Sequence, residues 1–285
     1  MDTVVVNGFF IGLVYGLVAV GLVVTYRCSR VLNFAYAGTG IVAAFVFSEL
    51  YVDNEIALGL ALAAAVALAA GISAATEAVV IRPLRDQPRI TATVGTLAVG
   101  SLLVIYASRR WGVNPRYTPP LVTGEGVTIA GLDIQRQQLL ILAVAVAVVT
   151  GLWALQRFTA FGLRLRATAL DPYAAGLVGV NNNATSMAAW AVVGALAGLS
   201  AILIAPSTTF DVNFMTGLVL RGLAAALIGG LTSVAGGFCA GIALGVVEAV
   251  IAYETPVIGT VEVVLALFVI VMLLVRPGGV VRSSY

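Results

Sequence analysis

Long apolar runs separated by short polar interruptions make up most of the chain. The runs are continuous and rich in Ala, Leu, Val and Gly, whereas strands of a membrane β-barrel would show short alternating segments. A helix needs about 20 mostly apolar residues to cross a bilayer. The pattern predicts helices at about 4–26, 33–52, 56–80, 90–108, 139–156, 184–205, 216–230, 235–253 and 258–275.

One of these runs, 216–230, is barely long enough to cross the hydrocarbon core, so it is either a full span or a re-entrant helix. The count is therefore eight or nine transmembrane or re-entrant helices. The composition agrees, because 61% of the residues are hydrophobic and only 10% are charged, against about 25% charged in soluble domains. We predict an all-α polytopic membrane protein in which residues 1–285 form a single transmembrane domain.

The distribution of arginine predicts the orientation of the chain. Positively charged residues concentrate in cytoplasmic loops, and every basic residue of this chain is an arginine. With the N-terminus outside, most arginines lie on the cytoplasmic side, and an odd number of crossings puts the C-terminus there as well. The cytoplasmic set is Arg27, Arg30, Arg82, Arg85, Arg89, Arg157, Arg164, Arg166, Arg276 and Arg282, and the outer set is Arg109, Arg110, Arg116 and Arg136.

The longest interruption, 109–137, is predicted to be an extracytoplasmic loop. It holds Pro115, Pro119, Pro120 and the strand-like stretch GVTIAGLDI, which are typical of a small ordered loop or hairpin. Two interpretations stay open: a docking surface for an external partner, or a plain connection between helices.

A second interruption, 157–183, is predicted to be a cytoplasmic loop that contains a helix of about two turns. Asp171 is a favourable N-cap, and Pro172 suits the first helical position, where no N–H is needed. Gly179 can end the helix in the left-handed conformation. A helix this short is not stable alone, so it must pack against something.

Apolar side chains of this short helix recur at helical spacing. Tyr173 and Leu177 are four residues apart, as are Ala174 and Val178, so each pair shares a face. The resulting apolar surface either rests on the chain's own transmembrane helices or inserts into a groove of a cytoplasmic partner, as amphipathic helices do in helix-in-groove recognition.

The sequence around this helix resembles a known family. GLRLRATALDPYAAGLVGVNNNATSMAAWAVVGALAGLSAIL at 162–203 is similar to the coupling-helix segment in permease subunits of bacterial ABC importers of the branched-chain amino acid type. In that family, a Gly-Arg-x-x-Arg-Ala start leads to an acidic cap and a short Ala-rich helix. Leu163 separates Gly162 from Arg164 here, and the positions that match are Asp171, Ala174, Ala175 and Gly179.

Further motifs extend the resemblance over most of the chain. AALIGGLTSVAGGFCAGIALGVVEAV at 225–250 is similar to the family's Gly-rich tract, with Thr232 where the family usually has Gly. LLVRPGGVVR at 273–282 resembles its C-terminal ending, and GLVYGLVAVGLVVTY at 12–26 with RVLNFAYAG at 30–38 resembles its N-terminal signature. The size resembles that of the shorter of the two permease subunits that such importers pair.

This resemblance implies a multi-pass protein of the bacterial plasma (inner) membrane with several partners. They are a second, related permease subunit in a heterodimer, two cytoplasmic ABC ATPases that contact the coupling helix, and an extracytoplasmic solute-binding protein. ATP and magnesium would bind to the partner ATPases, and we expect no cofactor in this chain. The chain has no Walker A lysine motif and no lysine at all, so the energy for transport must come from elsewhere.

The cargo stays open at this point. After Asn33, Phe34 and Ala35 the family commonly carries His or Gln, then Gly, then an acidic residue, whereas this chain has Tyr36, Ala37 and Gly38. If this tract lines the translocation path, the departure bears on the solute. Branched-chain amino acids and related small amides, urea or organic acids are all compatible with the family.

Several polar residues interrupt apolar runs and are candidates for the translocation path. Asn33, Phe34 and Tyr36 lie at the start of the second run, where polar groups must face protein or water; capping of that helix is the structural alternative for Asn33. Arg221 and Glu248 lie inside apolar runs, where an ionisable group costs several kcal/mol unless it is paired or hydrated. They are path or gate candidates, or a structural ion pair. Glu77 is expected to pair locally with Arg82 and Arg85.

Glycines at intervals of four make smooth stripes along two runs, and we expect close helix packing there. The two stripes are Gly8, Gly12 and Gly16, and Gly237, Gly241 and Gly245.

Other function classes are less compatible with the sequence. The chain has no histidine and no cluster of Cys and acidic residues in one run, so we expect no catalytic or metal site and no membrane-embedded enzyme. Nothing indicates a nucleic-acid partner. An autonomous secondary transporter or channel is the main alternative, but it would normally carry intramembrane carboxylates or broken helices in both halves of a repeat.

Overall fold

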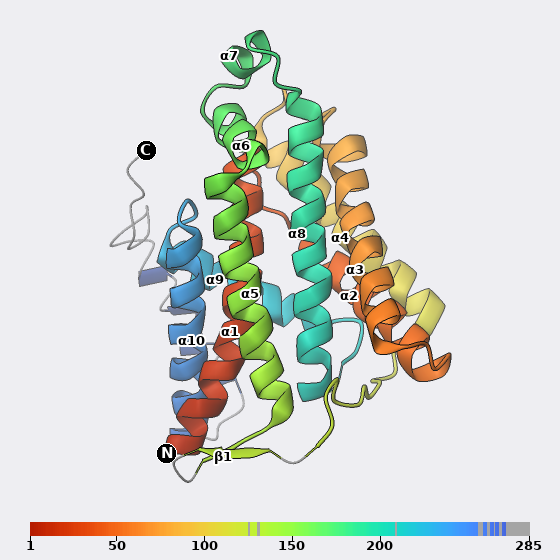
Figure 1. Cartoon of the computed structure of the whole chain (residues 1–285), viewed down its shortest axis with the longest axis vertical. Helices are drawn as coiled ribbons and strands as arrows, with labels where there is room; N and C mark the ends of the chain where they lie inside the picture. The colour runs from red at the N-terminus through yellow and green to blue at the C-terminus, as the bar shows by residue number, and fades with distance from the viewer. Residues whose placement is uncertain are drawn as a thin grey trace. The chain divides into compact units, whose positions relative to one another are not determined.

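Helices account for nearly all the regular structure of the chain. The computed structural model describes residues 1–124, 126–129, 132–208, 210–255, 259–260, 263–264, 266–267 and 270–271. The long helices are α1 (Asp2–Ser29), α2 (Ala35–Ser48), α3 (Leu58–Thr76), α4 (Arg89–Trp111), α5 (Arg136–Phe158), α8 (Asn182–Ile204), α9 (Phe214–Gly229) and α10 (Val234–Glu254). Two short helices, α6 (Ala160–Leu170) and α7 (Pro172–Leu177), connect α5 to α8 (Figure 1).

Seven helices in the described part of the chain are long and apolar enough to cross a membrane. Two of them extend through a π-helical turn, so that the spans run over 35–53 and 58–81. The run expected to be short forms α9, an apolar helix of 16 residues. The predicted all-α class is confirmed. The last predicted run, 258–275, and the Arg-Pro-Gly ending lie largely outside the described residues.

The chain forms two compact units, which we describe separately. The first comprises 1–23, 120–148 and 218–285, and the second comprises 24–119 and 149–217. In the second unit, α2 is the central helix and packs against α3, α4 and α8. Nearly every residue of α2 is buried. Small residues permit these contacts: a Cβ at Gly38 would lie 2.7 Å from the carbonyl oxygen of Gly100 in α4.

In the first unit, the two glycine stripes pack against each other. A Cβ at Gly8 would lie 2.8 Å from the carbonyl oxygen of Gly245, and one at Gly12 would lie 2.7 Å from that of Ile242. Gly16 and Gly241 are also in contact. The order of these contacts makes α1 and α10 antiparallel neighbours with their backbones touching, an arrangement that only glycine allows.

The interruption at 109–137 contains the hairpin that its sequence suggested. Strands β1 (Val127–Ile129) and β2 (Leu132–Ile134) pair antiparallel, with Thr128 opposite Asp133. The Thr128 hydroxyl donates a hydrogen bond to the Asp133 carboxylate over 2.6 Å. Ahead of the hairpin, the Leu121 N–H donates to the side-chain oxygen of Gln137, which ties the start of the loop to the first turn of α5.

The glycine contact predicts different effects for two chemically identical substitutions. Gly12→Ala should lower the free energy of unfolding by about 1–3 kcal/mol, because the new methyl group meets backbone that cannot move aside. Gly71→Ala in α3 is the matched control, since no atom lies within 4 Å of the position of its Cβ. Thermal unfolding of the detergent-purified chain measures both. Equal stability of the two variants would contradict the packing described here.

Candidate functional site

The short helix α7 has the cap that the sequence predicted. The Asp171 carboxylate accepts hydrogen bonds from the N–H groups of Tyr173 and Ala174 at 2.9 and 3.0 Å. Pro172 is the first helical residue, and Gly179 follows the helix with a φ of +84°. Aspartate at the N-cap and a left-handed glycine at the end satisfy backbone groups that a two-turn helix leaves unpaired.

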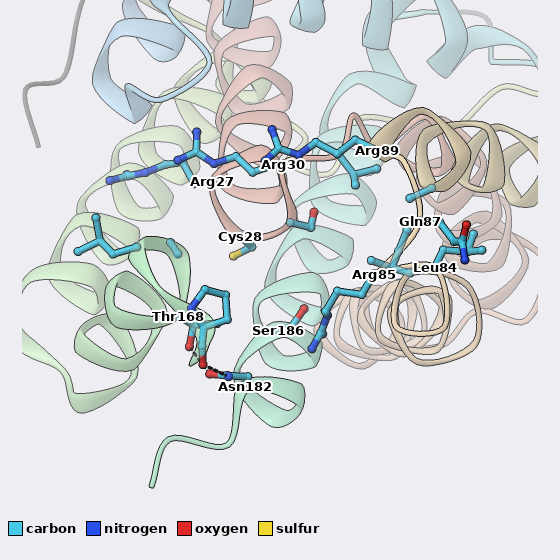
Figure 2. Close-up of a pocket in the computed structure, with 17 residues that line it drawn as sticks. Arg27, Cys28, Arg30, Leu84, Arg85, Gln87, Arg89, Thr168, Asn182 and Ser186 are labelled. Atoms are coloured by element: carbon cyan, nitrogen blue, oxygen red, sulfur yellow. Dashed lines mark hydrogen bonds between the residues drawn. The ribbon is translucent and has the colours of Figure 1, made fainter. Parts of the chain in front are cut away.

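A single asparagine fixes this helix to the start of α8. The Asn182 side-chain amide donates to the carbonyl oxygen of Pro172 over 2.6 Å, and its oxygen accepts from the Thr168 hydroxyl over 2.9 Å (Figure 2). The neighbouring Asn181 caps α8 by accepting from the Ala184 N–H. Asn182 therefore joins α6, α7 and α8 in one hydrogen-bonded unit.

The outer face of α7 is apolar and exposed. Ala175 is buried toward the rest of the chain, whereas Tyr173, Leu177 and Val178 are 78%, 72% and 79% exposed. An exposed group of three large apolar side chains on a capped, anchored helix is typical of a surface that contacts another protein. The alternative that these three side chains rest on the chain's own helices does not agree with this exposure.

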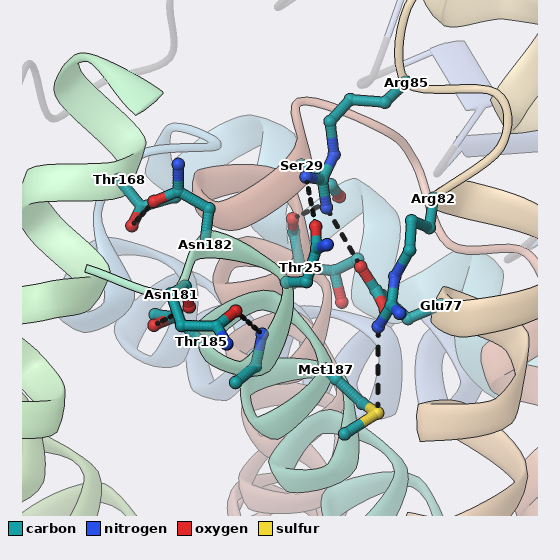
Figure 3. A network of polar contacts seen from close by, with 12 residues as sticks. Thr25, Ser29, Glu77, Arg82, Arg85, Thr168, Asn181, Asn182, Thr185 and Met187 are labelled. Atoms are coloured by element: carbon teal, nitrogen blue, oxygen red, sulfur yellow. Dashed lines mark hydrogen bonds and ion pairs between the residues drawn. The ribbon is translucent and has the colours of Figure 1, made fainter. Parts of the chain in front are cut away.

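A buried carboxylate joins the segment between α3 and α4 to the start of α8. Glu77 is fully buried and forms ion pairs with Arg82 at 2.9 Å and Arg85 at 3.1 Å, as expected from their spacing. Arg85 also donates to the Asn183 side chain over 2.9 Å (Figure 3). Because an isolated buried charge is very costly, these two guanidinium groups hold the segment in place.

The tract at the start of α2 is buried and only partly satisfied. Asn33 and Tyr36 are 3% and 1% exposed, and Asn33 Oδ1 has no hydrogen-bond partner among the described residues. The buried hydroxyl groups of Tyr36 and Ser200 interact with each other. Asn33 does not cap α2, since Phe34 is the N-cap and the cap has no side-chain hydrogen bond; the Phe34 N–H donates instead to the Thr96 hydroxyl.

Arg221 of α9 and Glu248 of α10 form a two-pronged ion pair. The Arg221 Nε lies 2.8 and 3.0 Å from the two carboxylate oxygens, and one Nη lies 2.7 Å from Oε1. The guanidinium carbon also lies 6.0 Å from the centre of the Tyr15 ring of α1. Both charges are mostly buried and compensate each other, so the pair stabilises the contact of α9 with α10 inside the first unit.

The ion pair predicts a non-additive response to charge removal. Arg221→Met should destabilise the fold by roughly 3–5 kcal/mol, because it leaves Glu248 buried without its partner. The double variant Arg221→Met, Glu248→Met should regain most of that loss, since two apolar side chains replace two charges. Thermal unfolding of the single and double variants checks this cycle. Additive losses would contradict a direct pairing.

Sequence reasoning missed two residues that organise this region. Asn182 and Asn183 belong to a run of three asparagines at the start of α8. Their partners, Pro172 and Arg85, lie 10 and 98 residues away along the chain. A polar run at a helix start, opposite a loop rich in arginine, is the pattern that points to such contacts.

Comparison with known proteins agrees with this arrangement. The family model for the permease component of branched-chain amino acid transport systems matches residues 4–276. The high-affinity branched-chain amino acid transport system permease protein BraD of Pseudomonas aeruginosa is 26% identical over 96% of this chain and 94% of its own. The corresponding LivH of Escherichia coli K12 is 25% identical over 96% and 93%.

An archaeal relative shows the same extent of similarity. The probable branched-chain amino acid transport permease protein LivH of Methanocaldococcus jannaschii is 28% identical over 93% of this chain and 87% of its own. The matches therefore run along nearly the whole length of each protein. Together with the seven apolar helices, they identify a multi-pass integral membrane protein. The chain belongs to the family of permease components of branched-chain amino acid transport systems.

Proposed function

We propose that this chain is a permease subunit of an ATP-driven ABC importer for branched-chain amino acids or related small solutes, and that α7 is its coupling helix. The exposed apolar face of α7, formed by Tyr173, Leu177 and Val178, is the observation that carries the proposal. ATP hydrolysis takes place in two cytoplasmic partner subunits. A second, related permease subunit completes the translocation path, and an extracytoplasmic binding protein delivers the solute.

The ends of the helices in the second unit support the proposed orientation, with the N-terminus outside and the C-terminus in the cytoplasm. Loops assigned to the cytoplasm from their arginines meet one another: Arg85 contacts Asn183, and Arg27 contacts Gln156. Loops assigned to the outside meet as well, because Arg110 pairs with Glu49 and Arg116 with Asp53. The assignment from charge and the contacts in the structure are therefore consistent.

In the proposed mechanism, α7 transmits movement of the ATPases to the membrane helices. ATP binding closes the two ATPases and draws the coupling helices of the two permeases together. Because Asn182 ties α7 to α8, movement of α7 displaces α8 and the helices packed on it, α2 and α3. The two permeases then exchange the side on which their shared path is open.

The charges inside the helices argue against a carrier that runs on an ion gradient. Such carriers use intramembrane carboxylates that bind and release a proton or cation. In the described part of the chain, Glu77 and Glu248 are the acidic residues in the interior of apolar spans, and both are ion-paired with arginine. The paired charges are suited to structure rather than to ion exchange.

The proposal predicts that α7 is needed for assembly with the ATPases. Tyr173→Asp and Leu177→Asp should each weaken co-purification of the ATPase subunits by about tenfold or more, because a charge replaces a large apolar contact. Val113→Asp is the matched control. Val113 is 65% exposed and follows the C-terminal end of α4, in the loop predicted to be extracytoplasmic. Pull-down of the ATPases from membranes with the full chain measures the effect.

Two results would contradict this proposal. One is normal assembly of the ATPases with both aspartate variants. The other is solute uptake by the purified chain alone in liposomes without ATP, which is the behaviour of an autonomous carrier or channel.

The tract at the start of α2 predicts a separate effect on transport. We propose that Asn33, Phe34 and Tyr36 of the second unit contribute to the translocation path, whereas a path role for Arg221 and Glu248 of the first unit stays a prediction. Asn33→Ala and Tyr36→Phe should alter the rate or the cargo preference of uptake about threefold or more while leaving the amount of assembled complex unchanged. Uptake of radiolabelled solutes by the complete importer checks this, and unchanged uptake would remove the tract from the path.

A further inference from the structure

A cavity of about 450 Å³ in the second unit has a strongly cationic wall. It lies between the end of α1, the segment that leads into α4, the α6–α7 junction and the start of α8. Four arginines, Arg27, Arg30, Arg85 and Arg89, line it, and Figure 2 shows them along its upper and right-hand walls. None of the lining residues is acidic.

Nearby carboxylates neutralise only part of this wall. Glu77 pairs with Arg82 and Arg85, and the Asp171 carboxylate is bound to the first N–H groups of α7. Asp86 is exposed and does not line the cavity. Among the described residues, Arg30 and Arg89 have no ion-pair partner, so the cavity carries an excess of positive charge. Guanidinium groups that line one cavity repel one another, and an anion between them would relieve this repulsion.

Arg30 occupies a backbone position after α1 at which a side chain is disfavoured. Arg30 follows α1 in the left-handed conformation, with a φ of 55°, and its N–H donates to the carbonyl oxygen of Tyr26. Glycine is the usual residue at this position after a helix, because a side chain is disfavoured there. The chain nevertheless has an arginine at this position, and its side chain lines the cavity.

The rest of the cavity lining combines polar side chains, among them Thr168 and Ser186, with an apolar patch. The apolar patch is made of Val31, Ile81, Leu84, Ala92 and Leu170. Leu170 and the nearby Ile90 are 71% and 72% exposed. The cavity lies at the ends of membrane spans, where lipid headgroups meet the protein. A cationic wall beside an apolar one fits a ligand with a charged head and a hydrocarbon tail.

We infer that this cavity binds a phosphate group, and that the headgroup of an anionic phospholipid supplies it. The planar forks of Arg30 and Arg89 suit phosphate oxygens, which arginine binds through two parallel hydrogen bonds. The volume is in the range of about 300–1,000 Å³ that small-molecule sites occupy. Because Pro172 also lines the cavity, a bound headgroup would contact the first residue of α7. This site is separate from the apolar face of α7, so it does not depend on the proposed coupling role.

The test compares lipid binding by three forms of the full chain in a neutral detergent. They are the wild type, the double variant Arg30→Gly, Arg89→Gln, and the control Arg109→Gln, Arg164→Gln. The control removes the same charge from exposed arginines that do not line the cavity. Glycine is favoured at the left-handed position of Arg30, so the double variant should unfold at the same temperature as the wild type without lipid.

Native mass spectrometry with phosphatidylglycerol and phosphatidylcholine gives the occupancy of the site. We expect the double variant to bind phosphatidylglycerol at least about tenfold more weakly than the wild type, since the loss of even one charged hydrogen bond is worth about a factor of ten. The control should change less than twofold. Inorganic phosphate should compete with phosphatidylglycerol in the wild type only.

The outcomes distinguish the sources of the phosphate. Stabilisation of the wild type by inorganic phosphate, without retention of phosphatidylglycerol, would support the phosphate site but assign it to a soluble ligand. Two results would overturn the inference. One is that the double variant binds both probes as tightly as the wild type does. The other is that the wild type binds neither probe. Neither result would affect the test of the coupling helix, which reads ATPase assembly.

Discussion

Close approach of helix backbones is the constraint on which the rest of this structure depends. In lipid there is no hydrophobic gain from pressing two apolar helices together, so association relies on van der Waals contact and on polar groups that find partners. Glycine provides the contact between α1 and α10 at Gly8, Gly12 and Gly16, and between α2 and α4 at Gly38. Where the backbones meet directly, the long side chains are left to face lipid or partner subunits.

Hydrogen bonds and ion pairs of polar side chains then hold neighbouring segments in place. Glu77 is buried and holds two arginines, one of which reaches Asn183 at the start of α8. The adjacent Asn182 holds the first residue of α7. Two neighbouring asparagines therefore connect the α3–α4 segment and α7 to one end of α8, a largely buried helix. A displacement at either contact is passed to α8 rather than absorbed by a flexible loop.

The sequence predicted the features that depend on local chemistry. Helix positions follow from apolar runs, the Asp171 cap from its place before Pro172, and the pairing of Glu77 with Arg82 and Arg85 from their spacing. Contacts between distant segments could not be predicted this way. The bond of Arg85 to Asn183 spans 98 residues, and the arginines of the cavity come from two segments, the end of α1 and the segment that leads into α4, whose proximity is a result of tertiary packing. Whether Arg221 and Glu248 paired with each other was open in the sequence, and their contact within the first unit answers it.

The repeating spacing of glycine in α1 and α10 has a mechanical consequence. Since both helices carry glycine at every fourth position, a shift of four residues, about 6 Å at 1.5 Å per residue, would again set glycine opposite glycine. Glycine packing alone therefore allows more than one register of the two helices. Arg221 removes this degeneracy, because it binds Glu248 of α10 and lies over the ring of Tyr15 in α1. The contacts of this one charged side chain therefore favour a single register of α1 against α10.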